Sequence, residues 1–287
     1  MRMWRWCLGV AAVLLLVSVC SAGPDQASPR PLTEPERALL HRAEERAIAG
    51  CMRRHGFEYT VAAPGPAAPE FPYGNDDPAW AAEHGFGVAH AGKVLADRRR
   101  ADPNYRYAVA LTAGRREAYQ TALDGGRAAS MAVPLPDGGT LYQNADGCVA
   151  EAQRGLYGDL RTWFRTRTLL ERLSSDYRPR VIADDRYRSA LTAWAACVQR
   201  RGYPVETPAG LRDRVAPATS GRPGRAEIRA AVAEADCAAA TGLVRSAHKV
   251  EAEYAARTYA ENRDLVEQYQ KLSVRALVVA RGTTGGE

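Results

Sequence analysis

The 287-residue chain lacks the short motifs that mark the common catalytic and nucleotide-binding sites. It contains no Gly-x-Ser-x-Gly, no His-Glu-x-x-His, no P-loop and no dinucleotide-binding glycine fingerprint. The run from Ser246 to Lys249 has the Ser-x-x-Lys spacing of penicillin-interactive enzymes, but the companion Lys-Thr-Gly and Ser-x-Asn elements are missing. We interpret that match as chance, so no motif identifies the protein as an enzyme.

Lysine is scarce, and the excess of positive charge is small. Only three of the 39 basic residues are lysines, and the many arginines, together with much alanine, are typical of GC-rich coding. The formal charge is +6, and it falls to +4 once Arg2 and Arg5 are removed with the expected export signal. A charge so close to neutral argues against nucleic acid as a partner.

No apolar run is long enough for a comfortable membrane span. The longest, Cys7 to Val19, has 13 residues, whereas a spanning helix needs about 20. It follows Arg2 and Arg5 and precedes small residues that end at Ala22, which is the pattern of a cleavable signal. We therefore predict a signal peptide over residues 1–22 and an exported protein, extracellular or associated with the cell envelope.

A lipid-anchored form is the alternative. In this reading Cys20 is the first mature residue and the lipid-attachment site, as in signals that resemble Leu-Ala-Gly-Cys. The run here is Val-Ser-Val-Cys, so Val19 departs from the usual small residue before the cysteine. Secretion and lipid anchoring both stay open at this point.

Four of the six cysteines follow the signal: Cys51, Cys148, Cys197 and Cys237. An even number of cysteines in an exported chain favours disulfides over free thiols. The run Cys-Met-Arg-Arg-His-Gly-Phe that begins at Cys51 returns as Cys-Val-Gln-Arg-Arg-Gly-Tyr at Cys197, and each copy is followed later by another cysteine. This parallel predicts the pairs Cys51–Cys148 and Cys197–Cys237, one of three connectivities.

The two copies read as helix ends of a duplicated unit. Cysteine lies on the buried stripe, glycine takes the left-handed conformation after the last turn, and the aromatic residue packs back on the helix. We predict a mainly α, disulfide-linked helical domain built from two pseudo-repeats with one small β-hairpin. Its parts are a tether at 23–32, a first half at 33–178, a second half at 179–281 and a disordered tail at 282–287.

Several boundaries follow from local signals. Thr33 and Glu36 form a capping box, and Asp77 is the N-cap of a helix that begins at Pro78. Val133 to Tyr142 predicts a hairpin with its turn at Asp137-Gly138. Two long helices are expected: one that begins at Cys148 and reaches Leu170, and one from Leu243 to Arg281 with no glycine or proline inside.

The densest group of titratable residues is Asp76, Asp77, Glu83, His84 and His90. It could bind a metal or perform acid–base chemistry, but its spacing matches no known ligand pattern. Asp77 is also explained as a helix cap and His84 as a favourable charge at a helix end. We expect no bound cofactor or metal.

Two other groups of residues have both a functional and a purely structural interpretation. Cys51 and His55 share a helix face, as a metal site or a nucleophile pair would, but the second copy has Arg201 in place of His55, which favours the disulfide. Two arginine groups could contact anionic lipid or wall polymer, although solvated helix faces explain them as well. They are Arg98, Arg99 and Arg100, and Arg161, Arg165 and Arg172.

Three segments resemble a family of uncharacterised secreted proteins and predicted lipoproteins from high-GC bacteria. They are Cys51 to Phe57, Phe71 to Gly87 and Gly147 to Asp159. The resemblance implies an envelope or extracellular location and brings no activity with it.

We therefore expect a non-catalytic binding or structural protein of the cell envelope or medium, with an unidentified partner there. The alternative is an envelope enzyme, hydrolase-like, that uses Asp76, Asp77, Glu83 or His84. The two differ in whether these side chains meet in a cleft.

Overall fold

The computed structural model describes residues 30–63, 65, 67–135 and 138–284, and it is mainly α-helical, as predicted. The predicted signal peptide and Cys20 lie outside the described residues. The helices are α1 (Glu34–Arg54), α2 (Pro78–His84), α3 (Val88–Ala101), α4 (Pro103–Ala110), α5 (Ala113–Asp124), α6 (Gly147–Tyr157), α7 (Leu160–Ala183), α8 (Asp185–Arg200), α9 (Pro208–Val215), α10 (Arg225–Thr241), α11 (Leu243–Glu261) and α12 (Arg263–Thr284).

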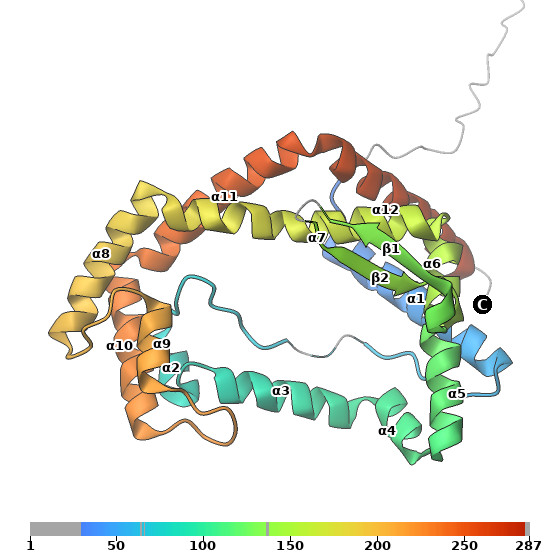
Figure 1. Ribbon diagram of the computed structural model, residues 1–287, viewed down its shortest axis with the longest axis horizontal. Helices are drawn as coiled ribbons and strands as arrows, with labels where there is room; N and C mark the ends of the chain where they lie inside the picture. Colours follow the sequence, from blue (N-terminus) through green and yellow to red (C-terminus); the bar gives the residue numbers. More distant parts are fainter. Residues whose placement is uncertain (1–29, 64, 66, 136–137, 285–287) are drawn as a thin grey trace, which may run out of the picture.

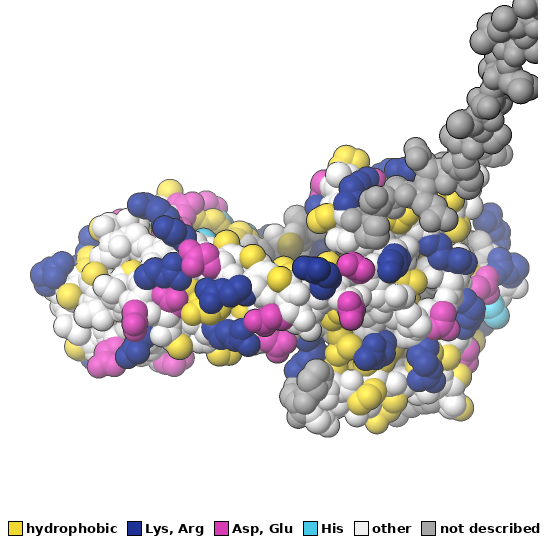
Figure 2. Space-filling view, turned by 90° about the horizontal axis from the view of Figure 1, so that it is seen from above, with side chains coloured by type: hydrophobic (Ala, Val, Ile, Leu, Met, Phe, Trp, Pro, Cys, Tyr) yellow, Lys and Arg dark blue, Asp and Glu magenta, His cyan; other side chains and the backbone are white. Residues whose placement is uncertain are grey.

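The helices form two lobes joined by a narrower middle (Figures 1 and 2). The α1 lobe contains α1, α5, α6, α12, the hairpin and the first part of α7. The α10 lobe contains α2, α8, α9, α10 and the adjoining ends of α7 and α11. Helices α7 and α11 connect the lobes along one side, and α3 spans the other side (Figure 1).

The lobes do not follow the two halves of the sequence. Helix α2 precedes residue 178 but packs on α10, and α12 comes from the end of the chain but packs on α1 and α6. The expected boundary between residues 178 and 179 falls inside α7. Each lobe therefore takes elements from both halves.

The core of the α1 lobe joins helices to one face of the hairpin. Strands β1 (Ser130–Pro134) and β2 (Thr140–Asn144) are antiparallel, with Val133 opposite Leu141. Met131 and Val133 are buried, whereas their neighbours on β1 are exposed, so β1 presents a single face to the helices. The predicted hairpin is confirmed and longer than expected; residue 137 of its expected turn lies outside the described residues.

The core of the α10 lobe is built around α10. Trp194 and Val198 of α8, Leu211 of α9 and Ala230 of α10 are fully buried in one cluster. Tyr73, from the segment before α2, joins the same cluster. Residues far apart in the sequence thus share this core.

Both predicted disulfides are present. Cys51 pairs with Cys148 and Cys197 with Cys237, with Cα atoms 5.4 and 5.7 Å apart. The first bridge joins α1 to α6, and the second joins α8 to α10.

The two related helix ends have the same cap. Gly56 (φ 75°) and Gly202 (φ 90°) are left-handed. The backbone N–H of Phe57 donates to the carbonyl of Met52, and that of Tyr203 donates to the carbonyl of Val198, both at 3.0 Å. These are the bonds of a glycine-closed helix end. A duplication of the whole unit stays a prediction.

Both long helices predicted from the sequence are interrupted. Gly158 (φ 88°) separates α6 from α7, and Asp159 caps α7 by accepting from the N–H of Thr162 at 2.7 Å. Asn262 separates α11 from α12, and its side-chain amide donates to the carbonyl of Thr258 at 2.8 Å. A left-handed glycine followed by a new N-cap, and an asparagine that bonds back to the preceding turn, therefore interrupt the helices where apolar periodicity alone predicted continuity.

The two ends of the described chain are more ordered than predicted. Arg30 pairs with Glu36, and Leu32 packs against the core, so residues 30–32 of the predicted tether contact the α1 lobe. Helix α12 continues to Thr284, within the tail predicted to be disordered. Among the described residues, no helix combines the length and the apolar character that crossing a membrane requires.

Candidate functional site

The candidate site lies where α2 and α3 meet α10, and two buried glutamates of α10 position it. Glu234 is 1% exposed and accepts from the backbone N–H of Asn75 at 3.1 Å and from the Arg212 guanidinium at 3.0 Å. Burial raises the pKa of Glu234, and the charge of Arg212 opposes that rise. This carboxylate therefore fixes the segment before α2 to the α10 lobe.

The second glutamate, Glu227, fixes the segment after α2. It accepts from the backbone N–H of Phe86 at 3.2 Å and from that of Ala218 at 2.9 Å. Gly85 has φ 59°, and a Cβ there would lie 2.5 Å from the Glu227 carboxylate, so this close approach requires glycine. Helix α2 is thus held at both ends by carboxylates seven residues apart on α10.

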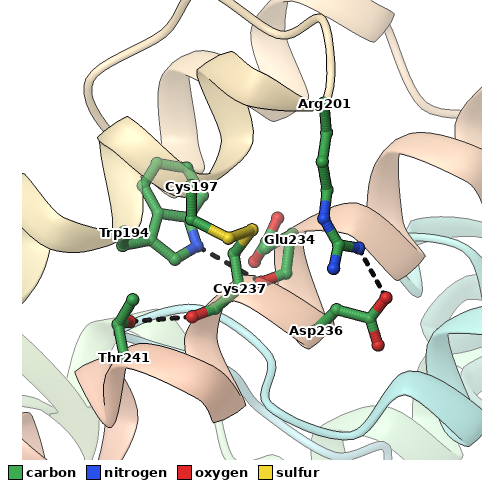
Figure 3. Close-up of a disulfide and its surroundings, with 7 residues drawn as sticks. All are labelled: Trp194, Cys197, Arg201, Glu234, Asp236, Cys237 and Thr241. Atoms are coloured by element: carbon green, nitrogen blue, oxygen red, sulfur yellow. Dashed lines mark hydrogen bonds and ion pairs between the residues drawn. A yellow bond between two sulfur atoms is a disulfide. The ribbon is translucent and has the colours of Figure 1, made fainter.

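The second disulfide stiffens the same helix (Figure 3). Cys237 of α10 is bonded to Cys197 of α8, and the indole N–H of Trp194 donates to the carbonyl of Glu234 at 3.2 Å. On the outer side, Arg201 pairs with Asp236. These bonds cross-link α8 to α10, the helix on which α2 packs.

A cavity of about 850 Å³ opens beside this junction. Its polar lining combines two imidazoles, two basic side chains and one carboxylate, and its remaining lining is mostly apolar. The lining residues are Glu83, His84, Ala89, His90, Lys93, Val94, Gly221, Arg222, Pro223 and Ile228.

The two imidazoles lie in contact with each other and with one indole. The ring centroids of His84 and His90 are 4.1 Å apart, and that of Trp80 lies 4.8 Å from His84 and 5.8 Å from His90. Burial lowers the pKa of His90, and the neighbouring His84 lowers it further. His90 is therefore held more firmly in its neutral form than a solvated histidine.

The charged side chains at the rim of the cavity are of both signs, and two of them have ionic partners. Glu83 Oε2 lies 3.8 Å from His84 Nε2, and Lys93 Nζ lies 2.5 Å from Asp97. Arg222 reaches the cavity from the loop before α10. Because Asp97 already pairs with Lys93, Arg222 is the positive charge that remains for a ligand, and the two imidazoles add hydrogen-bonding groups beside it.

The structure separates the four residues predicted to act together. Glu83 and His84 line the cavity, whereas Asp76 and Asp77 are exposed and are not part of its lining. Asp77 is the N-cap of α2, as predicted, and accepts from the N–H of Trp80 at 3.0 Å. Only half of the predicted group therefore belongs to one site.

Sequence reasoning missed the residues from the second half of the chain. Arg222, Pro223 and Ile228 line the cavity although they are about 130 residues from His84 and His90. No motif marks them, and the loop that carries Arg222 and Pro223 reads only as rich in proline and glycine.

The predicted Cys/His arrangement is a disulfide in the structure. Cys51, His55 and Cys148 place ligand atoms within 4.8 Å of one another, but the bridge uses both thiolates that a metal would require. Among the described residues, Glu83, His84 and His90 do not converge as closely as this triplet. Neither group is arranged as a metal centre.

Comparison with known proteins gives no match: no family model, no curated protein and no solved structure is similar to this chain.

Proposed function

We propose that this chain is an exported, non-catalytic binding protein of the cell envelope or medium, and that it binds a small organic anion in the cavity between α2, α3 and α10. The observation that carries the proposal is the composition of the cavity wall. His84, His90, Lys93 and Arg222 offer hydrogen-bond donors or positive charge, and Glu83 is the one acid among them.

The apolar part of the lining supports a compact organic ligand. Ala89, Val94, Pro223 and Ile228 provide apolar surface beside the polar groups. Ligand sites typically combine an apolar wall with a few placed polar groups. Arginine binds carboxylates and phosphates through paired hydrogen bonds, so Arg222 is the side chain expected to contribute most.

Export is supported by two independent features of the chain. The first 22 residues have the pattern of a signal peptide, two disulfides cross-link the chain, and disulfides persist mainly in oxidising compartments. The resemblance to secreted proteins of high-GC bacteria agrees with this location. A lipid at Cys20 would keep the protein at the envelope.

Binding can be tested by thermal shift and calorimetric titration with citrate, succinate and glycerol phosphate. We expect saturable one-to-one binding of at least one of them. Arg222→Gln should weaken it by roughly tenfold or more, because a hydrogen bond to a charged group is lost. Arg200→Gln, an exposed arginine of the same lobe, is the matched control and should bind normally. Equal loss in both variants, or no binding by the native protein, contradicts the proposal.

A hydrolase is the second candidate, favoured by the pair of Glu83 and His84 at the cavity rim. A carboxylate beside an imidazole could transfer protons during hydrolysis. The test is turnover of an ester such as p-nitrophenyl acetate by the native protein and by His84→Ala, with the fold of both checked by circular dichroism. Turnover that the substitution abolishes would favour the enzyme. Equal rates in the native protein and the variant favour the binding protein.

A further inference from the structure

We propose that α3 and α4 form a docking surface for an anionic lipid membrane. This inference is independent of the cavity. Among the described residues, ten large hydrophobic side chains are exposed, and four of them lie on these two short helices: Val88, Leu95, Tyr105 and Val109. Such a concentration of exposed apolar groups is uncommon on a surface that faces only water.

Helix α3 has little packing of its own. Of its described residues only Ala89 is buried, and Leu95 is 61% exposed. The Arg98 guanidinium donates to the carbonyl of Gly65 at 2.6 Å, which ties the end of α3 to the neighbouring loop. An amphipathic helix normally buries its apolar stripe, so the stripe of α3 is available to a partner.

The four exposed apolar residues form two pairs, one on each helix, and Arg99 links them. Val88, Leu95 and Arg99 are spaced by seven and four residues, so they lie on one face of α3. The Arg99 guanidinium lies over the ring of Tyr105 at 5.6 Å, which connects that face to α4. Tyr105 and Val109 are four residues apart on α4 and form the second pair.

Charge identifies the occupant as an anionic lipid surface. Residues 88–110 hold five basic and two acidic residues, a net charge of +3 in a chain of +6. Asp97 pairs with Lys93 and Arg100, and Asp102 caps α4, so neither acid opposes Arg99 or Arg106. Exposed arginines beside leucine, valine and tyrosine are the composition of helices that lie in a membrane interface.

The opposite face of the molecule differs. Seen from the side of α7, α11 and α12, acidic side chains lie among basic ones across both lobes (Figure 2). The second predicted arginine group, on α7, is therefore not part of this surface. Helices α3 and α4 lie on the side of the molecule away from α7, α11 and α12 (Figure 1).

The test is cosedimentation of the mature protein, produced without lipid, with vesicles of phosphatidylcholine alone or with one third phosphatidylglycerol. We expect binding only to the anionic vesicles and release at high salt. The Arg99→Gln/Arg106→Gln variant removes the two arginines that neither acid opposes and keeps the Arg98 tether. It should bind roughly 25-fold more weakly, at about fivefold per arginine. The control Arg200→Gln/Arg229→Gln removes two exposed arginines of the α10 lobe and should bind normally.

A second variant tests the apolar contribution. Leu95→Asp should reduce binding by at least tenfold, whereas Val278→Asp, at a similarly exposed position on α12, should not. Equal binding to both vesicle types, equal loss in test and control variants, or self-association that Leu95→Asp abolishes would overturn the membrane proposal. Light scattering without vesicles distinguishes the last case.

Discussion

The two lobes share a helix end and differ in what that end supports. In the α1 lobe, Cys51 and Cys148 link α1 to α6, and a hairpin and stacked aromatic rings complete the core. In the α10 lobe, Cys197 and Cys237 link α8 to α10, and two buried carboxylates of α10 hold a segment from the distant first half. The same local cap thus belongs to a core completed by α12 in one lobe, and in the other to the helix that anchors the segment around α2.

The largest expected effect is loss of a disulfide. By loop entropy, Cys51→Ser/Cys148→Ser should destabilise the protein by about 4.7 kcal/mol, and Cys197→Ser/Cys237→Ser by about 3.9 kcal/mol, because the first bridge closes the longer loop. Urea unfolding measures the difference, and a larger loss from the second pair would show that the α10 lobe depends more on its bridge.

The next effect compares how much a buried polar side chain contributes to stability in each lobe. Glu234→Leu should cost roughly 3 kcal/mol, because the guanidinium of Arg212 and the N–H of Asn75 lose a buried partner. Gln153→Leu in the α1 lobe should cost about 1–2 kcal/mol, since it breaks only the side-chain bonds to Gln143 and Glu44. Equal free energies of unfolding for the two variants would remove the distinction.

A smaller effect concerns pH and falls where α2 and α3 meet the α10 lobe. The pKa of His90 is lowered in the folded state by burial and by His84, while Glu83 opposes the shift and Lys93 adds to it. Below about pH 6.5 the unfolded chain therefore binds the proton more readily, and stability should fall as the pH falls from there. The urea midpoint from pH 8 to pH 5 checks this, and His90→Gln should flatten the profile; an unchanged profile in that variant would contradict the assignment to His90.

The smallest expected effect is loss of a helix cap. Asp77→Ala removes the N-cap of α2 and should cost about 1 kcal/mol. Asp159→Ala removes the N-cap of α7 in the other lobe and should cost a similar amount. Hydrogen exchange would then reveal whether α2 opens alone, as a docked element would, or with the rest of its lobe.

Much of the fold was predictable because its signals are local. The capping box at Thr33, the cap at Asp77, the glycine-closed helix ends and the hairpin each depend on a few neighbouring residues. Periodicity failed at Gly158 and Asn262, where single residues break an apolar pattern that continues on both sides.

The candidate site was only half predictable, because it is assembled from two distant segments. Glu83, His84 and His90 stood out as a dense titratable group. Arg222 and the anchoring Glu227 and Glu234 carry no local signal, since their role depends on how α2 docks on α10. Such a site is formed by the packing of distant segments, and local sequence patterns do not predict which segments come together.

The five histidines allow the most direct test of the proposed binding site, because only His84 and His90 line the cavity while His41, His55 and His248 lie elsewhere. Their ring signals can be assigned by single substitutions and followed by NMR during titration with the anion that binds most tightly in calorimetry. We predict that the signals of His84 and His90 shift and saturate at one equivalent while the other three stay constant. Saturation with no change at His84 and His90, or with shifts confined to the other three, would contradict the account.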